Sequence, residues 1–240
     1  MTKPPDDLML ARLNAQYKTA TANVVLGAAL DLYRGQITMV SSFGADSAVL
    51  LHLLARIDPD VPVLMVDTLM LFPETLQYQT ELSQHLGLRD VRIIRAQDQD
   101  LDWADSTGDL HLSDPDACCG LRKVAPLARA LTGFWAAITG RKRFQTGQRA
   151  RMDLFERDQS RLRVNPLAAW RPEQIRSYLR RHDLPPHPLV AHGFASIGCA
   201  PCTSRIGAGE DPRSGRWRGR AKVECGIHFG TSPSASRGIA

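Results

Sequence analysis

The five cysteines of this chain divide into two pairs and one single residue. Cys118 and Cys119 are adjacent, Cys199 and Cys202 are separated by two residues, and Cys225 stands alone near the C-terminus. Two thiolate pairs that converge in a fold can share one metal centre, which leaves the fifth thiol free to act as a nucleophile. The cysteine pattern therefore predicts a metal site together with a reactive cysteine.

Two other interpretations of these cysteines are weaker. A single cysteine is often a small buried apolar side chain, but the segment 222–228 is too polar and glycine-interrupted for a core. A chain of 240 residues also buries enough surface without disulfides. Its first residues hold no apolar signal region, and no apolar run approaches ~18 residues. We therefore expect a cytoplasmic protein with no membrane partner, in a compartment where thiols stay reduced.

The charge balance favours an anionic partner. The chain has 30 Lys and Arg against 25 Asp and Glu, a net charge of +5. Much of the excess lies in two glycine-containing clusters without helical pattern, at 141–151 and 213–222. We interpret these clusters as loops that enclose a small anion, with a solvated or RNA-binding surface as the alternative.

Alternating apolar patterns predict a series of β-α units. Strands are expected at 36–41, 61–66, 91–95 and 134–139, with another ending at 164–167, and helices at 21–33, 47–56, 73–86, 119–131 and 171–182. Strands that alternate with helices of this length indicate an α/β fold with a doubly wound, mostly parallel sheet.

The two ends of the chain differ from its middle in the regular structure that their sequences predict. Proline and glycine become frequent after Leu184, and regular structure is expected to thin out. We expect residues 1–203 to form the nucleotide- and cluster-binding α/β domain, and 204–240 a mobile arm that carries Cys225. The N-terminal segment up to about Ala20 is expected either to contact a second copy in a homo-oligomer or to be loose.

The segment 41–47, between the first expected strand and the next helix, has the composition of a phosphate-binding loop. Small residues at Ser41, Ser42 and Gly44 let backbone N–H groups face inward around an anion. Asp46 or Ser47 can cap the following helix, whose N-terminus adds positive potential. An open parallel sheet binds ligands at this edge. A purely structural helix cap is the alternative interpretation.

This loop and five later motifs carry a resemblance to a known family. Residues 42–47 (SFGADS) resemble the pyrophosphate-binding loop, usually SGGxDS, of the adenine nucleotide alpha hydrolase-like superfamily. The later motifs are DTLMLFPET at 67–75, CCGLRK at 118–123, SIGCAPCT at 196–203, DPRSGRW at 211–217 and ECGIH at 224–228. As an ordered set over residues 40–228, they resemble the assimilatory sulfonucleotide reductases, and the cluster-bearing adenosine 5′-phosphosulfate (APS) reductases best. Phe43, Leu69, Phe144 and Ile227 depart from the family pattern and put the fine shape of the nucleotide pocket in doubt.

The resemblance implies that Cys118, Cys119, Cys199 and Cys202 hold a [4Fe–4S] cluster. Four thiolates complete such a cluster, one on each iron. Zinc stays an alternative, although its ligands are typically two to four residues apart rather than adjacent. Lys123 is implied to link the charges of cluster and substrate; a surface lysine is the alternative.

The resemblance also implies a reaction at sulfur. A thiolate at Cys225 takes the sulfuryl group of APS, releases AMP and leaves an S-sulfocysteine, from which reduced thioredoxin releases sulfite. The carboxylate of Glu224 disfavours that thiolate, so neighbouring cations or His228 must offset it. The implied substrate-binding residues are Ser41, Ser42, Gly44, Asp46, Ser47, Lys123, Arg141, Arg143, Arg213, Arg216 and His228.

Three rival functions remain open at this point. The nearest is reduction of the 3′-phosphorylated substrate, PAPS, whose usual reductases lack the four cluster cysteines. A tRNA-thiolating enzyme also combines a pyrophosphate loop, cysteines and basic clusters, but Phe43 and the ECGIH segment count against it. A zinc-bearing RNA-binding module leaves Cys225 unexplained. The preferred interpretation has no nucleic-acid partner.

Overall fold

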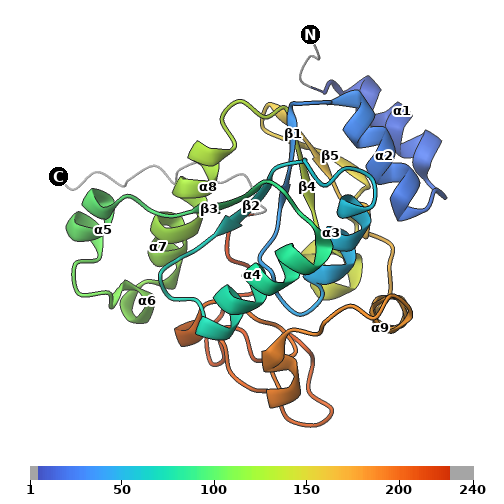
Figure 1. Ribbon diagram of the computed structural model, residues 1–240. Coiled ribbons are helices and arrows are strands. Elements are labelled where there is room, and N and C mark those ends of the chain that lie inside the picture. The colour runs from blue at the N-terminus through green and yellow to red at the C-terminus, as the bar shows by residue number, and fades with distance from the viewer. Residues whose placement is uncertain (1–4, 228–240) are drawn as a thin grey trace.

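A single six-stranded sheet forms the centre of the computed structural model, which describes residues 5–227 (Figure 1). The strands are β1 (Ile37–Val40), β2 (Val63–Val66), β3 (Val91–Ile94), β4 (Ala136–Thr139), β5 (Phe155–Asp158) and β6 (Arg161–Val164), in the order β3-β2-β1-β4-β6-β5. All neighbouring pairs are parallel except β5 and β6. The chain leaves β1 for β2 on one side and returns to β4 on the other, so a crevice opens at the carboxyl ends of these strands.

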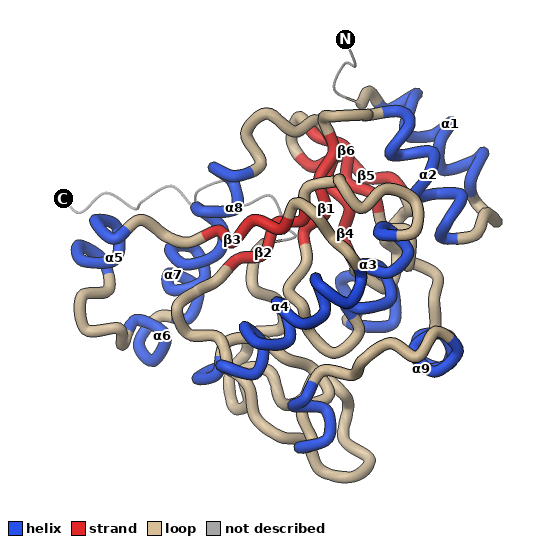
Figure 2. Tube along the Cα trace, viewed as in Figure 1, coloured by secondary structure: helices blue, strands red, loops and turns tan. Residues whose placement is uncertain are grey.

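Helices cover both faces of this sheet, as Figure 2 shows. They are α1 (Asp7–Tyr17), α2 (Ala22–Leu32), α3 (Ser47–Ala55), α4 (Pro73–Leu86), α5 (Asp98–Ala104), α6 (Leu110–Ser113), α7 (Pro115–Cys119), α8 (Ala125–Ala130) and α9 (Pro172–Arg181). Strand side chains alternate between two apolar clusters. Met65 joins the large cluster with α2 and α3, whereas Leu64 packs with Leu127 of α8. The expected doubly wound, mostly parallel α/β fold is confirmed.

The N-terminal segment is a helix within its described part, so the prediction of a loose segment is wrong for α1. Asp6 caps the helix by accepting a hydrogen bond from the N–H of Met9. The side chain of Asn14 donates to the carbonyl of Phe155 at 2.8 Å and accepts from its N–H at 3.0 Å. Helix α1 therefore lies against β5 at the sheet edge.

Two differences from the expected elements lie near the cysteines and the sheet edge. The helix expected at 119–131 begins earlier, at α7, and contains a π-helical turn at Gly120–Val124 before α8. Strand β5 and the short helices α5 and α6 were not predicted. Within residues 5–227, no helix is both long enough and apolar enough to cross a membrane.

Candidate active site

A cavity of about 280 Å³ opens at the carboxyl ends of β1, β2 and β4. One wall is the loop 41–47, and another is the segment after β4 with Arg141 and Lys142. Residues 195–199, 211–217 and 224–227 close the remaining side. The site residues predicted at 41–47 thus share one cavity with Lys123, Arg213, Arg216 and Cys225.

The loop 41–47 follows β1 directly and leads into α3. Phe43 has a positive φ of 47° and a fully buried ring, so it keeps a backbone shape that favours glycine by anchoring its side chain in the core. Its N–H donates to the hydroxyl of Ser41 at 3.2 Å. The N-terminus of α3 therefore faces the cavity with backbone N–H groups, a natural place for phosphate.

Asp46 does not cap α3 with its side chain, contrary to one of the two caps proposed from the sequence. It accepts a hydrogen bond from the ammonium of Lys142 at 2.9 Å instead. Burial lowers the pKa of Lys142, and the Asp46 carboxylate opposes that shift. Lys142 was predicted only as part of a basic cluster. Its place in the loop that follows β4, three residues after Thr139, is the sequence signal that could have found it.

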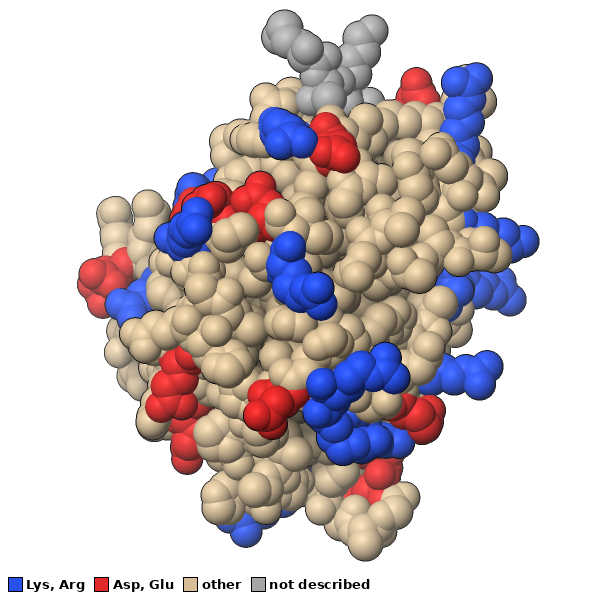
Figure 3. Space-filling view, turned by 45° about the vertical axis from the view of Figure 1, so that its right-hand side comes forward, with Lys and Arg blue, Asp and Glu red and all other residues tan. Residues whose placement is uncertain are grey.

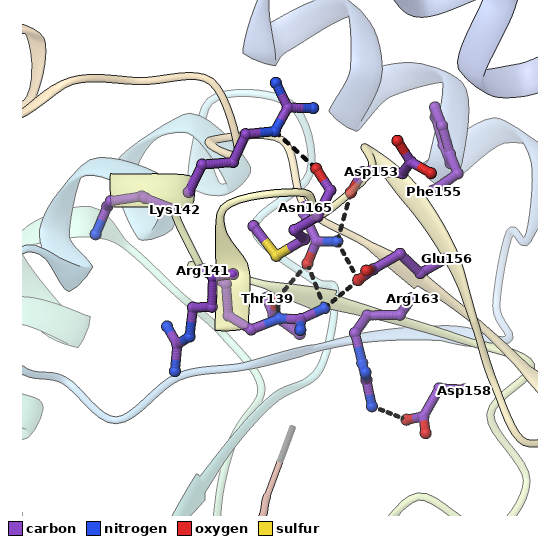
Figure 4. Close-up of polar contacts among 12 residues, drawn as sticks. Thr139, Arg141, Lys142, Asp153, Phe155, Glu156, Asp158, Arg163 and Asn165 are labelled. Atoms are coloured by element: carbon purple, nitrogen blue, oxygen red, sulfur yellow. Dashed lines mark hydrogen bonds and ion pairs between the residues drawn. The ribbon is translucent and has the colours of Figure 1, made fainter. Parts of the chain in front are cut away.

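Arg141 is held by a polar network at the ends of β4 and β6 (Figure 4). Its guanidinium donates to the hydroxyl of Thr139 at 3.2 Å, to Oδ1 of Asn165 at 3.1 Å, and to the carboxylate of Glu156. The amide of Asn165 donates in turn to Glu156 and to the carbonyl of Asp153, both at 2.8 Å. Burial lowers the pKa of Arg141 to about 10, so the side chain stays cationic at neutral pH.

Arg143 is the predicted site residue that the fold turns away from the cavity. Its Nε donates to the carbonyl of Met152 at 2.7 Å and ties down the loop that leads to β5. It does not line the cavity. His228 lies outside the described residues.

Part of the positive charge is directed inward. Among residues 5–227, six cationic side chains are buried: Arg122, Lys123, Arg141, Lys142, Arg149 and Arg163. Four of them, Lys123, Arg141, Lys142 and Arg149, line the cavity. On the face drawn in Figure 3, surface Lys and Arg side chains stand among Asp and Glu side chains. Buried cations around a cavity suit a small anion better than an extended polyanion.

The two cysteine pairs meet beside this cavity. Cys118 and Cys119 end α7 and are buried, while Cys199 and Cys202 flank a short 3-10 turn. Cys199 pairs with Leu71 in an antiparallel bridge, and the hydroxyl of Thr68 lies 3.2 Å from its sulfur. This contact joins the CxxC segment to the loop after β2.

The charges around the cysteines suit a shared anionic group. Burial, together with the nearby thiols of Cys119 and Cys199, raises the pKa of the Cys118 thiol to about 11. Lys123 donates to the sulfur of Cys119 at 3.6 Å. Burial lowers the pKa of Lys123, but the thiols of Cys199, Cys119 and Cys225 outweigh this and raise it above its ordinary value.

The donor set fits an iron–sulfur cluster. Across residues 5–227, no three His, Cys, Asp or Glu side chains are grouped as the ligands of one metal ion. A four-iron cluster takes one thiolate on each iron and does not require its ligands to surround a single ion. Three buried cysteines and the half-buried Cys202, with Lys123 beside Cys119, match that requirement.

The C-terminal residues of the described chain close over the cavity. The guanidinium of Arg216 donates to the carbonyl of Ile197 at 3.1 Å and lies 4.5 Å above the ring of Trp217. Gly198 leaves room for it, because a Cβ there would lie 2.2 Å from a guanidinium nitrogen of Arg216. Cys225 is half-buried at the rim, and Glu224 beside it is paired with Arg149.

A parallel sheet with a phosphate-type loop after β1 and cations at its carboxyl end defines a nucleotide-binding α/β protein. Residues 36–205 match the model of the phosphoadenosine phosphosulfate reductase domain family. The chain belongs to this family.

Full-length relatives and a solved structure agree with this assignment. The adenosine 5′-phosphosulfate reductase of Chelativorans sp. is 47% identical over 95% of this chain and 94% of the relative. The enzyme of that name from Mesorhizobium japonicum is 50% identical over 86% of this chain and 81% of its own length. The phosphoadenylyl-sulfate reductase of Candida auris superposes with a TM-score of 0.71 at 23% identity, covering 84% of this chain and 98% of its own. That last likeness concerns the fold alone.

Proposed function

We propose that this protein reduces adenosine 5′-phosphosulfate to sulfite and AMP in the cytoplasm, with reduced thioredoxin as electron donor. Such a reaction belongs to sulfate assimilation and supplies sulfur for cysteine biosynthesis. The observation that carries the proposal is that Cys225 and the loop 41–47 line the same cavity. Relatives named APS reductase that match nearly end to end support the same conclusion.

The cavity offers a distinct partner for each part of this substrate. Backbone N–H groups of the loop 41–47 and the N-terminus of α3 would receive the phosphate. The guanidinium groups of Arg141, Arg213 and Arg216, which line the cavity, would bind sulfate and phosphate oxygens. Lys123 and Lys142 add positive charge where the leaving phosphate gains negative charge.

The first chemical step is attack by the Cys225 thiolate on the sulfur of the substrate. A sulfur–sulfur bond forms while the bond from sulfur to the phosphate oxygen breaks, and AMP leaves with that electron pair. A thioredoxin thiolate then attacks the sulfur of Cys225 and releases sulfite. The second thioredoxin thiol resolves the mixed disulfide, so thioredoxin is oxidised and supplies both electrons.

We also propose that Cys118, Cys119, Cys199 and Cys202 hold a [4Fe–4S] cluster. When bound, this group would supply a fixed negative charge near Lys123 and a link between the two cysteine segments. Lys123 would balance that charge at the cavity wall. Residues 1–203 would form the binding domain, and the arm 204–240 would close for sulfuryl transfer and open for thioredoxin.

One relative favours PAPS as a second candidate substrate. The phosphoadenosine 5′-phosphosulfate reductase of Gloeobacter violaceus is 35% identical over 93% of this chain. Values of kcat/KM measured for APS and PAPS with the same preparation would decide between the two substrates.

The reaction class is tested by mass spectrometry of the intact protein. Protein purified without oxygen is mixed with APS in the absence of reductant, then mapped by peptides. We expect one sulfuryl adduct on Cys225, absent from C225S, that thioredoxin removes with release of sulfite. An unmodified Cys225 in protein that retains its metal would contradict the proposal, and assays with ATP and tRNA would follow.

A further inference from the structure

Arg149 and Glu224 form a buried ion pair at the rim of the cavity. Nε and Nη2 of Arg149 each donate to a different carboxylate oxygen of Glu224, both at 2.6 Å. The two side chains are only 6% and 7% exposed. Such a two-bonded pair has one defined geometry, which a single contact between flexible side chains lacks. We call it the Arg149–Glu224 clamp.

The remaining contacts of Arg149 commit it to the protein rather than to a ligand. Its Nη1 donates to Oε1 of Gln145 at 2.5 Å, so all three guanidinium nitrogens are bonded to side chains. Thr146 donates to the same Glu224 carboxylate at 3.1 Å. Arg141, in contrast, is held by the strand ends. The loop 145–149 therefore binds the Glu224 side chain.

The clamp fixes the residue next to the reactive cysteine. Glu224 directly precedes Cys225, so two firm bonds to its carboxylate restrict where the thiol can lie. Arg213 adds to this restraint, because it donates to the carbonyl of Val223 at 3.1 Å and lies 3.7 Å from Glu224. Beyond Cys225, Gly226 has a φ of 81°, where the chain turns sharply.

The clamp also neutralises the carboxylate that stands closest in sequence to the thiol. A free carboxylate at this position would repel both a thiolate and an anionic substrate. Paired with Arg149, the Glu224 charge is offset, and Arg213 offsets it further. The sequence predicted that neighbouring cations or His228 must offset the Glu224 carboxylate, and within the described residues the structure assigns this role to Arg149.

We propose that Arg149 is a positioning residue that holds Cys225 in line for attack on sulfur through Glu224. The inference rests on the proposed function above and deepens it. Arg149 contributes to the rate of sulfuryl transfer and not to the affinity for the nucleotide. A displacement of the nucleophile by about 1 Å can slow such a step roughly 100-fold.

The test compares R149Q, R149K and E224Q with R151Q, a matched control at an exposed arginine of the same loop. Single-turnover formation of the Cys225 adduct is followed by intact mass, and the Kd for AMP is measured separately. We expect R149Q and E224Q to form the adduct roughly 100-fold more slowly with Kd changed less than about threefold. R149K recovers part of the rate and R151Q keeps all of it.

The double variant R149Q/E224Q shows whether the two residues act as one unit. A shared role predicts that it is no slower than either single variant. Adduct formation by R149Q at the wild-type rate, or a loss explained by Kd alone, would overturn the inference.

Alkylation of Cys225 by iodoacetamide separates failure of the clamp from failure of the proposed function. The reaction needs no APS, so it reports arm position even if wild-type protein forms no adduct. We expect alkylation to be at least about tenfold faster in R149Q/E224Q, which breaks the clamp without leaving a free carboxylate beside the thiol, than in wild type, and unchanged in R151Q. Equal rates in R149Q/E224Q and wild type would exclude the clamp.

Discussion

Two walls of the same cavity are built in opposite ways. The strand-end network (Thr139, Arg141, Glu156 and Asn165) bonds Nε and Nη2 of Arg141 to neighbours on β4, β5 and the residue after β6. The loop wall (residues 196–217) has few regular elements. It contains Arg216 Nε and Trp217 Nε1, the two side-chain polar atoms found buried without a hydrogen-bond partner in the described chain.

The difference separates a preorganised wall from an adaptable one. A buried polar atom without a partner costs about 1–3 kcal/mol, and Trp217 also has a strained φ of 48°. The loop wall carries these costs at the side where the arm would move, whereas the strand-end network has no comparable strain. Damage to the network should therefore reduce stability and activity together, while damage to the loop wall should reduce activity alone.

The largest effect is expected from N165L, which removes the central member of the strand-end network. Arg141 and Glu156 each lose a buried hydrogen bond, so the free energy of unfolding should fall by about 3 kcal/mol, and activity should fall with it. Urea unfolding measures the first quantity. The same substitution at exposed Asn23, N23L, should change stability by less than about 0.5 kcal/mol. Equal stability of N165L and wild type would remove the contrast between the two walls.

The next prediction concerns His187, which attaches the segment that leads into the loop wall. It is fully buried, lies 3.1 Å from the hydroxyl of Thr75, and accepts from the N–H of Leu189 at 3.2 Å. Burial lowers the pKa of His187 to about 4, although Glu74 opposes the shift. The folded protein therefore holds His187 neutral.

The pH dependence follows from that shift. The unfolded chain binds the proton first as pH falls, so stability is lost between about pH 6.5 and pH 4, to a total on the order of 3 kcal/mol. Urea unfolding of wild type and H187Q at pH 7 and pH 4.5 measures the difference. A wild-type loss no greater than that of H187Q would show that His187 does not anchor the segment.

G198A is the selective test of the loop wall. The added methyl would displace the flexible guanidinium of Arg216 rather than any backbone atom. The free energy of unfolding should therefore change by less than about 1 kcal/mol. Turnover should fall about tenfold, because an arginine that lines the cavity is moved. G27A is the control, because a Cβ there meets nothing within 4 Å. A stability loss in G198A as large as that of N165L would contradict the distinction.

The smallest effect is expected far from both walls. Asp31 and Arg34 form an ion pair at 2.6 Å with side chains 74% and 80% exposed. R34A should change the free energy of unfolding by about 0.3 kcal/mol and leave turnover unchanged. Thermal unfolding with and without added salt checks this, and a shift above 1 kcal/mol would reveal an unrecognised role for α2.

The sequence predicted elements whose boundaries are set by local chemistry. Helix α4 was predicted to the residue, because Pro73 starts it and Gly87 ends it with a φ of 67°. Strand β5 was missed because three of its four residues, Glu156, Arg157 and Asp158, are charged. Its identity depends on pairing with β6, a tertiary contact that no local pattern encodes.

The candidate site shows the same division between features set by local sequence and features set by tertiary contacts. The loop 41–47 and the cysteines were singled out from residue types and spacing, and the structure places Cys199 and Cys225 in one cavity with this loop. The hydrogen-bonding partners of the site residues were not predicted from the sequence. Arg141 depends on Asn165, and Glu224 depends on Arg149, a residue 75 positions away. The fold brings such pairs together from distant parts of the chain, so no periodicity or local spacing in the sequence indicates them.

Asn14 has a consequence for how this protein behaves in crowded solution. By bonding both the N–H and the carbonyl of Phe155, its amide imitates one residue of an additional strand beside β5. An uncovered edge strand invites pairing with the edge of another molecule, which is a route to aggregation. Helix α1 therefore serves as a cover against edge-to-edge association, and a chain without it should precipitate more readily while its cavity stays intact.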